Sequence, residues 1–124
     1  MYEVIFYKTR DGKEPIVDYI FDLKEKSKTS KNEKIILEKI LTYIKALKEY
    51  GTRAGMPIVK HIDGNLWELR PLKNRIFFFY WRDDTFVLLH YFAKKTNKTP
   101  VREIDQARRN LKDFLERSIW LWKR

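Results

Sequence analysis

Three consecutive segments, separated by two-residue connections, most constrain what this chain can fold into. They are NLWELRP (65–71), NRIFFFYWR (74–82) and TFVLLHYFAKK (85–95), and each has the β-branched and aromatic residues typical of strands. Leu72-Lys73 and Asp83-Asp84 connect them, and a two-residue connection between strands requires a tight hairpin. The segments therefore predict an antiparallel meander.

Helical patterns flank this meander. A strand is predicted at residues 2–7, a further short strand at 58–62, and helices at 14–26, at 31–50 and from Thr99-Pro100 onward. Ser30 with Glu33 three residues later is typical of a capping box, and Gly51 is typical of a helix C-terminus. The order predicts one α+β domain of residues 1–124, with an N-terminal strand, a helical hairpin, a mainly antiparallel sheet and a C-terminal helix.

The charge of the chain favours an anionic partner. The 124 residues carry a net charge of +10, while 44% of them are hydrophobic, which is typical of a globular protein and not of a disordered basic tail. There is no cysteine, which excludes disulfides and thiolate metal sites. No apolar run approaches the roughly 20 residues of a membrane span, and the polar start does not resemble a signal peptide. We therefore expect a cytoplasmic protein without membrane contact.

The usual motifs of metal and cofactor sites are missing. The two histidines, His61 and His90, are far apart in the sequence, and the four glycines do not form a phosphate-binding loop. The pair Asp83-Asp84 is typical of a turn. Glu68 and Arg70 have the spacing of the Glu-x-Lys of metal-dependent nucleases, but arginine replaces the lysine, and Asp63 is the only nearby acid upstream. We therefore predict no metal and no cofactor.

Cationic side chains cluster where the meander strands end. Arg70 ends the first strand, Arg75 begins the second, and Lys94 and Lys95 end the third. Because neighbouring strands are antiparallel, these ends meet at one edge of the sheet, and we call the four residues the cationic rim. Such a rim suits a phosphate, to which arginine offers a bidentate fork and lysine a point charge. The alternative is a set of solvated strand ends whose lysines discourage aggregation.

The rim also suits metal-free cleavage of RNA, in which the 2′-OH attacks the adjacent phosphate. Arg70 and Arg75 would stabilise the negative charge of the transition state. Lys94 or Lys95, crowded by other cations, would act as the base. Strand alternation allows one of the two to face the site directly, and we expect the larger effect at Lys95.

Other polar residues are candidates for contacts with RNA: Lys60, His61, His90, Thr96 and Lys98. His90 is either the group that protonates the leaving 5′-oxygen or a hydrogen-bonded core histidine. His61 is either a contact to RNA or a plain surface histidine. Trp120 and Trp122 either pack against the domain or contact a partner.

The motifs LWELRP, NRIFFFYW and FVLLHYFAKKTNKTPVREIDQARR resemble the RelE/HigB-type toxins of bacterial type II toxin–antitoxin systems, particularly the phage Gp49-like HigB branch. The resemblance extends from about Ile58 to Arg109, and the strand and helices before it fit the same layout. It implies that Arg70 is the strand arginine of the family, and that Lys94 and Lys95 are its basic residues after the last strand. The C-terminal tyrosine of some RelE proteins has no counterpart here.

The resemblance also implies an activity and partners. Members are typically ribosome-dependent endoribonucleases, which cut mRNA in the ribosomal A site and so inhibit translation. A helix-turn-helix antitoxin, HigA-like and encoded in the same operon, would bind the toxin in a hetero-oligomer. The alternatives are a non-catalytic RNA- or DNA-binding module that uses the same cations, and an interaction protein whose charge serves solubility.

Overall fold

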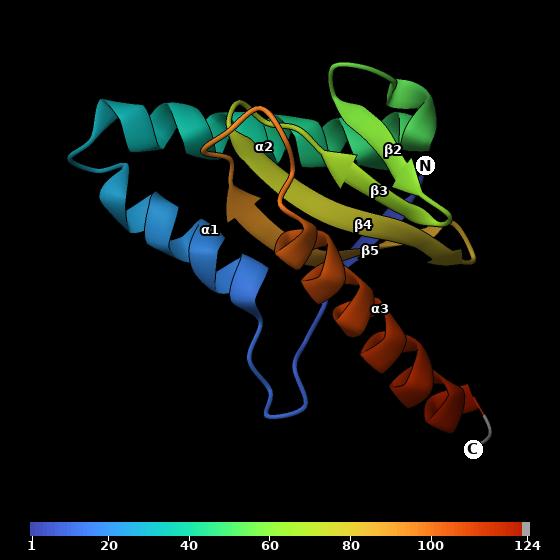
Figure 1. The fold of residues 1–124 in the computed structure, drawn as a ribbon. Helices are drawn as coiled ribbons and strands as arrows, with labels where there is room; N and C mark the ends of the chain where they lie inside the picture. The colour runs from blue at the N-terminus through green and yellow to red at the C-terminus, as the bar shows by residue number, and fades with distance from the viewer. Residues whose placement is uncertain (123–124) are drawn as a thin grey trace.

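The computed structural model describes the backbone of residues 1–122 and the side chains of residues 1–118. Along the chain lie β1 (Glu3–Phe6), α1 (Pro15–Lys26), α2 (Lys31–Tyr50), a short 3-10 helix (Gly51–Ala54), β2 (Val59–Asp63), β3 (Leu66–Leu69), β4 (Asn74–Arg82), β5 (Thr85–Ala93) and α3 (Val101–Trp122) (Figure 1). The side chains of Trp120 and Trp122 lie outside the described part.

The five strands form one sheet in the order β1-β5-β4-β3-β2. The segment from β2 to β5 is the predicted antiparallel meander, whereas β1 joins the sheet parallel to β5. The predicted α+β class, with its helical hairpin, mainly antiparallel sheet and C-terminal helix, is confirmed.

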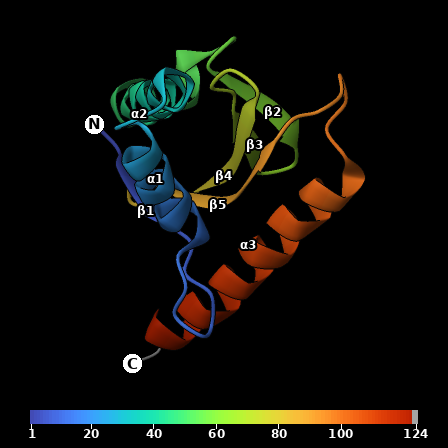
Figure 2. The ribbon, with the colours of Figure 1, turned by 90° about the vertical axis from the view of Figure 1, so that its left-hand side faces the viewer.

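The helices cover the two faces of the sheet separately. Figure 2 shows α1 and α2 on one side of the sheet and α3 on the other. Phe78 and Leu88 pack in the core under α1 and α2, whereas Phe77 and Phe79 pack in the second core under α3. Because side chains alternate across a strand, the aromatic run of β4 supplies both cores. This alternation also fixes which polar side chains share the α3 face.

The helix boundaries follow their predicted caps with one difference. Ser30 Oγ accepts a hydrogen bond from Glu33 N (3.3 Å), as an N-cap should. The reciprocal half of the predicted capping box does not form, because Ser30 N donates to Lys26 O (2.9 Å) at the end of α1. Gly51, with φ +60°, ends α2 as expected.

Both predicted hairpin turns adopt a left-handed backbone conformation. Asp83 and Asp84 have φ +49° and +57°, and aspartate is among the residues that tolerate this region. In the β3–β4 turn, Asn74 N donates to Pro71 O (3.0 Å), and Leu72 has φ +57°. A turn of this kind ordinarily places glycine there, so Leu72 carries a strain of about 1–3 kcal/mol.

A carboxylate ties α3 to the N-terminal segment. Asp113 Oδ2 accepts hydrogen bonds from Tyr7 Oη and Arg117 Nη2, and Oδ1 accepts one from Arg10 Nε, all at 2.6 Å. We call these four residues the Asp113 cluster. Burial alone would raise the pKa of Asp113, but the three hydrogen bonds lower it below its ordinary value.

None of the helices in the described part of the chain combines the length and the apolarity that a bilayer span requires.

Candidate nucleic-acid interface

Three strand ends bring cations to one place on the α3 face of the sheet. Arg70 directly follows β3, Arg75 is the second residue of β4, and Lys94 directly follows β5. Arg75 lies opposite the buried Phe92 of β5, and Lys94 has the same strand parity as Phe92. Side chains of one parity share a face, so Lys94 is the lysine of the rim that faces these arginines.

A buried carboxylate lies at the centre of these cations. Glu68 of β3 is 2% exposed, and its Oε1 lies 3.4 Å from Arg70 Nε and 3.9 Å from Arg75 Nε. Lys60 of β2 is paired directly opposite Glu68. We call Glu68, Lys60, Arg70, Arg75 and Lys94 the Glu68 cluster. It contains four cations and one carboxylate.

The electrostatics of the Glu68 cluster are unbalanced. Burial raises the pKa of Glu68, although Arg75 and Arg70 oppose this shift. Desolvation lowers the pKa of the Lys94 ammonium, and the neighbouring Arg75 and Arg70 guanidinium groups lower it further. Glu68 Oε2 is buried and accepts no hydrogen bond from the described residues. An anion bound beside these cations would relieve their mutual repulsion.

Arg75 is held rigidly inside the cluster. Its Nη1 donates to the carbonyl oxygens of Leu72 and Asn74, both at 2.8 Å. Its side chain is almost fully buried. Burial lowers the pKa of Arg75, as does the charge of Arg70, but a guanidinium stays charged in proteins. A positive group fixed before an anion arrives needs little reorganisation to bind it.

A polar pocket of about 560 Å³ opens beside the cluster. Its lining residues come from the β3–β4 turn, β4 and the loop after β5: Leu72, Lys73, Arg75, Lys94, Lys95, Thr96 and Asn97. Arg75 and Lys94 link the pocket to the Glu68 cluster. The predicted residues Lys95 and Thr96 line the same pocket, where Lys95 is exposed and Lys94 is half-buried.

The remaining predicted contacts do not join the cluster, apart from Lys60. Lys98 is exposed further along the loop, beyond the lining residues, and its carbonyl accepts from Thr96 Oγ1 (3.0 Å). His61 alternates with Lys60 on β2, so it faces the other side, where its ring contacts Trp67. His61 Nε2 is also bonded to Gly64 O (2.7 Å).

His90 is on the α3 face but is engaged with the helix. Its Nε2 lies 2.7 Å from Glu103 Oε1, and its ring stacks parallel to Phe77 at 6.2 Å. Of the two alternatives, the geometry matches a half-buried, hydrogen-bonded histidine. Within the described residues, no group of three or more His, Cys, Asp or Glu side chains is arranged to hold a metal ion.

A comparison with protein-family models identifies the family of the chain. The model of the family described as Phage derived protein Gp49-like (DUF891) matches residues 28–112, which is more than half of the chain. This chain belongs to the Gp49-like family. The family is associated with toxin–antitoxin systems. No curated protein matches the sequence.

The centre of this Gp49-like site escaped the sequence interpretation. The sequence pattern favours no catalytic role for Glu68, yet it is the residue around which the cations gather. The available signal was its spacing from Arg70, because two residues apart on a strand share a face. Lys73 and Glu103 were also missed, and nothing in the sequence pattern separates them from ordinary surface charges.

Proposed function

We propose that this Gp49-like protein is the toxin of a type II toxin–antitoxin system and a ribosome-dependent endoribonuclease of the RelE/HigB kind. The observation that carries the proposal is the Glu68 cluster, in which four cations converge on one sheet face around a single buried carboxylate. Membership of a family associated with toxin–antitoxin systems supports the same conclusion.

In the proposed reaction the RNA supplies its own nucleophile, and no metal takes part. The 2′-OH attacks the adjacent phosphate and gives up its proton, the bond from phosphorus to the 5′-oxygen of the next nucleotide breaks, and that oxygen takes a proton from water, leaving a 2′,3′-cyclic phosphate. Arg70 and Arg75 stabilise the negative charge that the phosphoryl oxygens gain in the transition state. Removal of one such donor typically costs about 100-fold in rate.

Lys94 is the proposed base for the 2′-OH. Burial and the neighbouring guanidinium groups lower its pKa, which raises the fraction of neutral amine at neutral pH. Lys95 lines the outer wall of the pocket and is proposed to hold the RNA backbone with Thr96. His90 is left out of this mechanism, because Glu103 engages its Nε2.

The ribosome is the proposed source of substrate positioning. The Glu68 cluster supplies mainly charge, so the reaction would still need its 2′-OH and phosphate to be oriented. The ribosome would supply that orientation, which alone can lower the barrier by several kcal/mol. The protein would act in the cytoplasm on mRNA in the A site. A HigA-like helix-turn-helix antitoxin from the same operon would neutralise it in a hetero-oligomer.

The proposal is tested by expressing the chain without an antitoxin in a bacterial host and mapping mRNA ends on translating ribosomes. We expect growth arrest and new mRNA 5′ ends within translated regions, with naked mRNA cut poorly by the purified protein. Folded protein that binds RNA without cutting it would favour the non-catalytic RNA-binding module. Normal growth and no RNA binding would remove both readings.

A further inference from the structure

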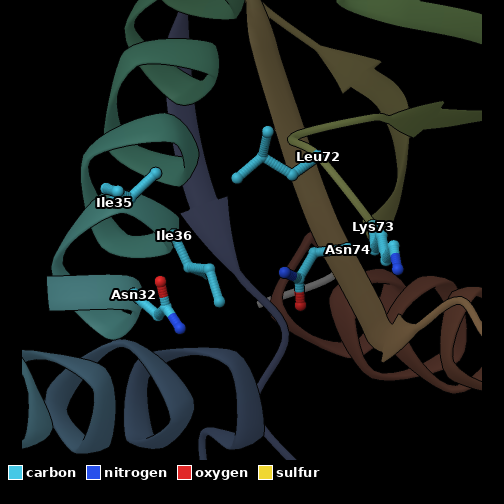
Figure 3. A pocket seen from close by; sticks show the side chains of 6 residues that line it. All are labelled: Asn32, Ile35, Ile36, Leu72, Lys73 and Asn74. Carbon is cyan, nitrogen blue, oxygen red and sulfur yellow. The ribbon is translucent and has the colours of Figure 1, made fainter. Parts of the chain in front are cut away.

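A second pocket lies across the β3–β4 turn from the cationic one and has the opposite character. Its volume is about 540 Å³, within the range of about 300–1,000 Å³ found for small-molecule sites. It lies between the start of α2 and the turn, and it is lined by Asn32, Ile35, Ile36, Leu72, Lys73 and Asn74 (Figure 3). Most of the lining surface is hydrocarbon.

The two pockets share a wall. Leu72 and Lys73 line both the apolar pocket and the cationic pocket that contains Arg75 and Lys94. If the anionic group of a ligand binds in the cationic pocket, the part of the ligand next to that group can therefore reach the apolar pocket. A nucleotide is such a ligand, because it joins a phosphate to a flat base whose two faces can pack against hydrocarbon.

The shared wall is held by the cationic site itself. Leu72 is 45% exposed although its backbone has φ +57°, a conformation that leucine rarely adopts. Arg75 Nη1 donates to Leu72 O (2.8 Å), and Lys94 N donates to Lys73 O (2.7 Å). The bonds that arrange the cations thus also hold an apolar side chain outward between the two pockets. Such strain persists where the surrounding structure over-determines it, and it is concentrated at binding sites.

Two carboxamides border the apolar pocket. Asn74 is almost fully buried, and its Oδ1 accepts a hydrogen bond from Tyr19 Oη (2.7 Å). Figure 3 shows the amide nitrogen of Asn74 on the side that faces Ile36, with the Asn32 carboxamide nearby on α2. Hydrocarbon walls with amide groups at the border suit a base, which has a stacking face and a hydrogen-bonding edge.

We propose that the apolar pocket binds the nucleobase next to the phosphate held by the Glu68 cluster. Ile35, Ile36 and Leu72 contact the face of the base, and the Asn74 amide donates to its edge. This inference rests on the proposed function, because it needs RNA on the cationic side. The shared wall favours a nucleobase over an apolar side chain of a partner protein, since a nucleotide occupies both pockets with one short connection.

The test is a binding measurement that does not require cleavage. Octaribonucleotides with 2′-O-methyl groups lack the attacking hydroxyl, and a series of them carries one abasic nucleotide at each successive position. Fluorescence anisotropy at low salt gives the affinity of each. We expect the abasic substitution at one position to weaken binding about 10-fold, within the range for loss of one stacked base.

Two variants locate the base in the pocket. Leu72→Asn introduces a polar residue that tolerates positive φ, and Ile35→Gln replaces hydrocarbon of the pocket wall by an amide on the exposed side of α2. In both variants, abasic substitution at that position should no longer weaken binding. The salt dependence of binding should stay as in the wild-type protein. Leu41→Gln is the matched control, because Leu41 is a similarly exposed apolar residue of α2 outside the pocket. Thermal melts verify the fold of all three.

The outcomes separate the inference from the proposed function. Wild-type protein that binds intact and abasic oligonucleotides equally overturns the base pocket and leaves RNA binding by the cations intact; the pocket is then free for a protein side chain. A base effect that survives in Leu72→Asn and Ile35→Gln also overturns the inference, because the base then lies elsewhere. Binding of no oligonucleotide also overturns the inference, and the proposed function is then decided by the mRNA ends mapped on translating ribosomes.

Discussion

Two clusters of charge in this protein each place a carboxylate beside two arginines, and they differ in how well that carboxylate is hydrogen-bonded. In the Asp113 cluster, both carboxylate oxygens accept short hydrogen bonds, from Arg10 on one side and from Tyr7 and Arg117 on the other. In the Glu68 cluster, Oε1 has longer ionic contacts to Arg70 and Arg75, and Oε2 is buried without a hydrogen bond from the described residues.

The difference appears in the pKa of each carboxyl. Hydrogen bonds hold the pKa of Asp113 below its ordinary value, whereas burial raises that of Glu68 despite the surrounding cations. A satisfied carboxylate stabilises the contact between α3 and the N-terminal segment. An unsatisfied one among excess cations is the observation on which we base the proposed RNA site, since perturbed ionisable groups concentrate at functional sites.

The largest expected effect is on catalysis. Arg70→Ala and Lys94→Ala should each lower single-turnover cleavage of ribosome-bound mRNA by about 100-fold. Lys95→Ala should have a smaller effect, because Lys95 lies on the outer wall of the pocket; this reverses the expectation that the sequence alone supports. A greater loss in Lys95→Ala than in Lys94→Ala would show that the buried side of the pocket is not where the chemistry occurs.

Stability should respond in the opposite order. Asp113→Asn removes a charged acceptor of three hydrogen bonds and should lower the free energy of unfolding by about 2 kcal/mol. The raised pKa of Glu68 means that its ionised form is disfavoured in the folded state, so Glu68→Gln should leave the free energy of unfolding at neutral pH unchanged or raise it. Urea denaturation of both variants measures this, and a larger loss in Glu68→Gln would mean that Glu68 is the better satisfied carboxylate.

The two carboxyls should also give opposite pH dependences. Asp113 has a lowered pKa in the folded state, so its contribution is present above the unfolded pKa and is lost as the pH falls through the folded pKa. Glu68 has a raised pKa, so its contribution is present below the unfolded pKa and is lost as the pH rises through the folded pKa.

Unfolding free energies measured from about pH 3 to about pH 7 separate these contributions. The advantage of wild-type protein over Asp113→Asn should shrink toward acid. The advantage of Glu68→Gln over wild-type protein should grow toward neutral pH. Parallel pH curves for wild-type protein and both variants would refute the assignment of either shift.

The smallest expected effect is on the salt dependence of RNA binding. Lys60 is exposed at the border of the Glu68 cluster, where it can neutralise one phosphate. Lys60→Ala should reduce the slope of log K against log salt by about 0.7 with single-stranded RNA. Lys45→Ala, which removes an exposed lysine of α2, is the control and should leave the slope unchanged.

Strand patterning made much of this site predictable. Two-residue connections fix antiparallel neighbours, and this rule places Arg70, Arg75 and the end of β5 at one edge before any coordinates are known. The choice between Lys94 and Lys95 required the actual register, because β4 and β5 pair with a shift between Phe77 and Phe78. The parallel pairing of β1 with β5 joins distant segments, which local pattern does not encode.

Other features depend on tertiary packing. Glu68 reads as an ordinary charged strand residue until burial and its neighbours are known. Leu72 at positive φ contradicts local preference, and the conformation is maintained by bonds from Arg75 and Asn74 N. The pairing of His90 with Glu103 joins β5 to α3 across a loop whose path the sequence leaves open.

One binding experiment tests most directly whether RNA is bound by the excess of cations in the Glu68 cluster or by the net charge of the whole protein. Lys94→Ala and Arg10→Ala each remove one positive charge, the first from the Glu68 cluster and the second from the Asp113 cluster. Affinity for a single-stranded oligoribonucleotide at fixed salt should fall at least about 10-fold for Lys94→Ala and less than about 2-fold for Arg10→Ala. Equal losses in the two variants would contradict the account, because RNA would then respond only to net charge.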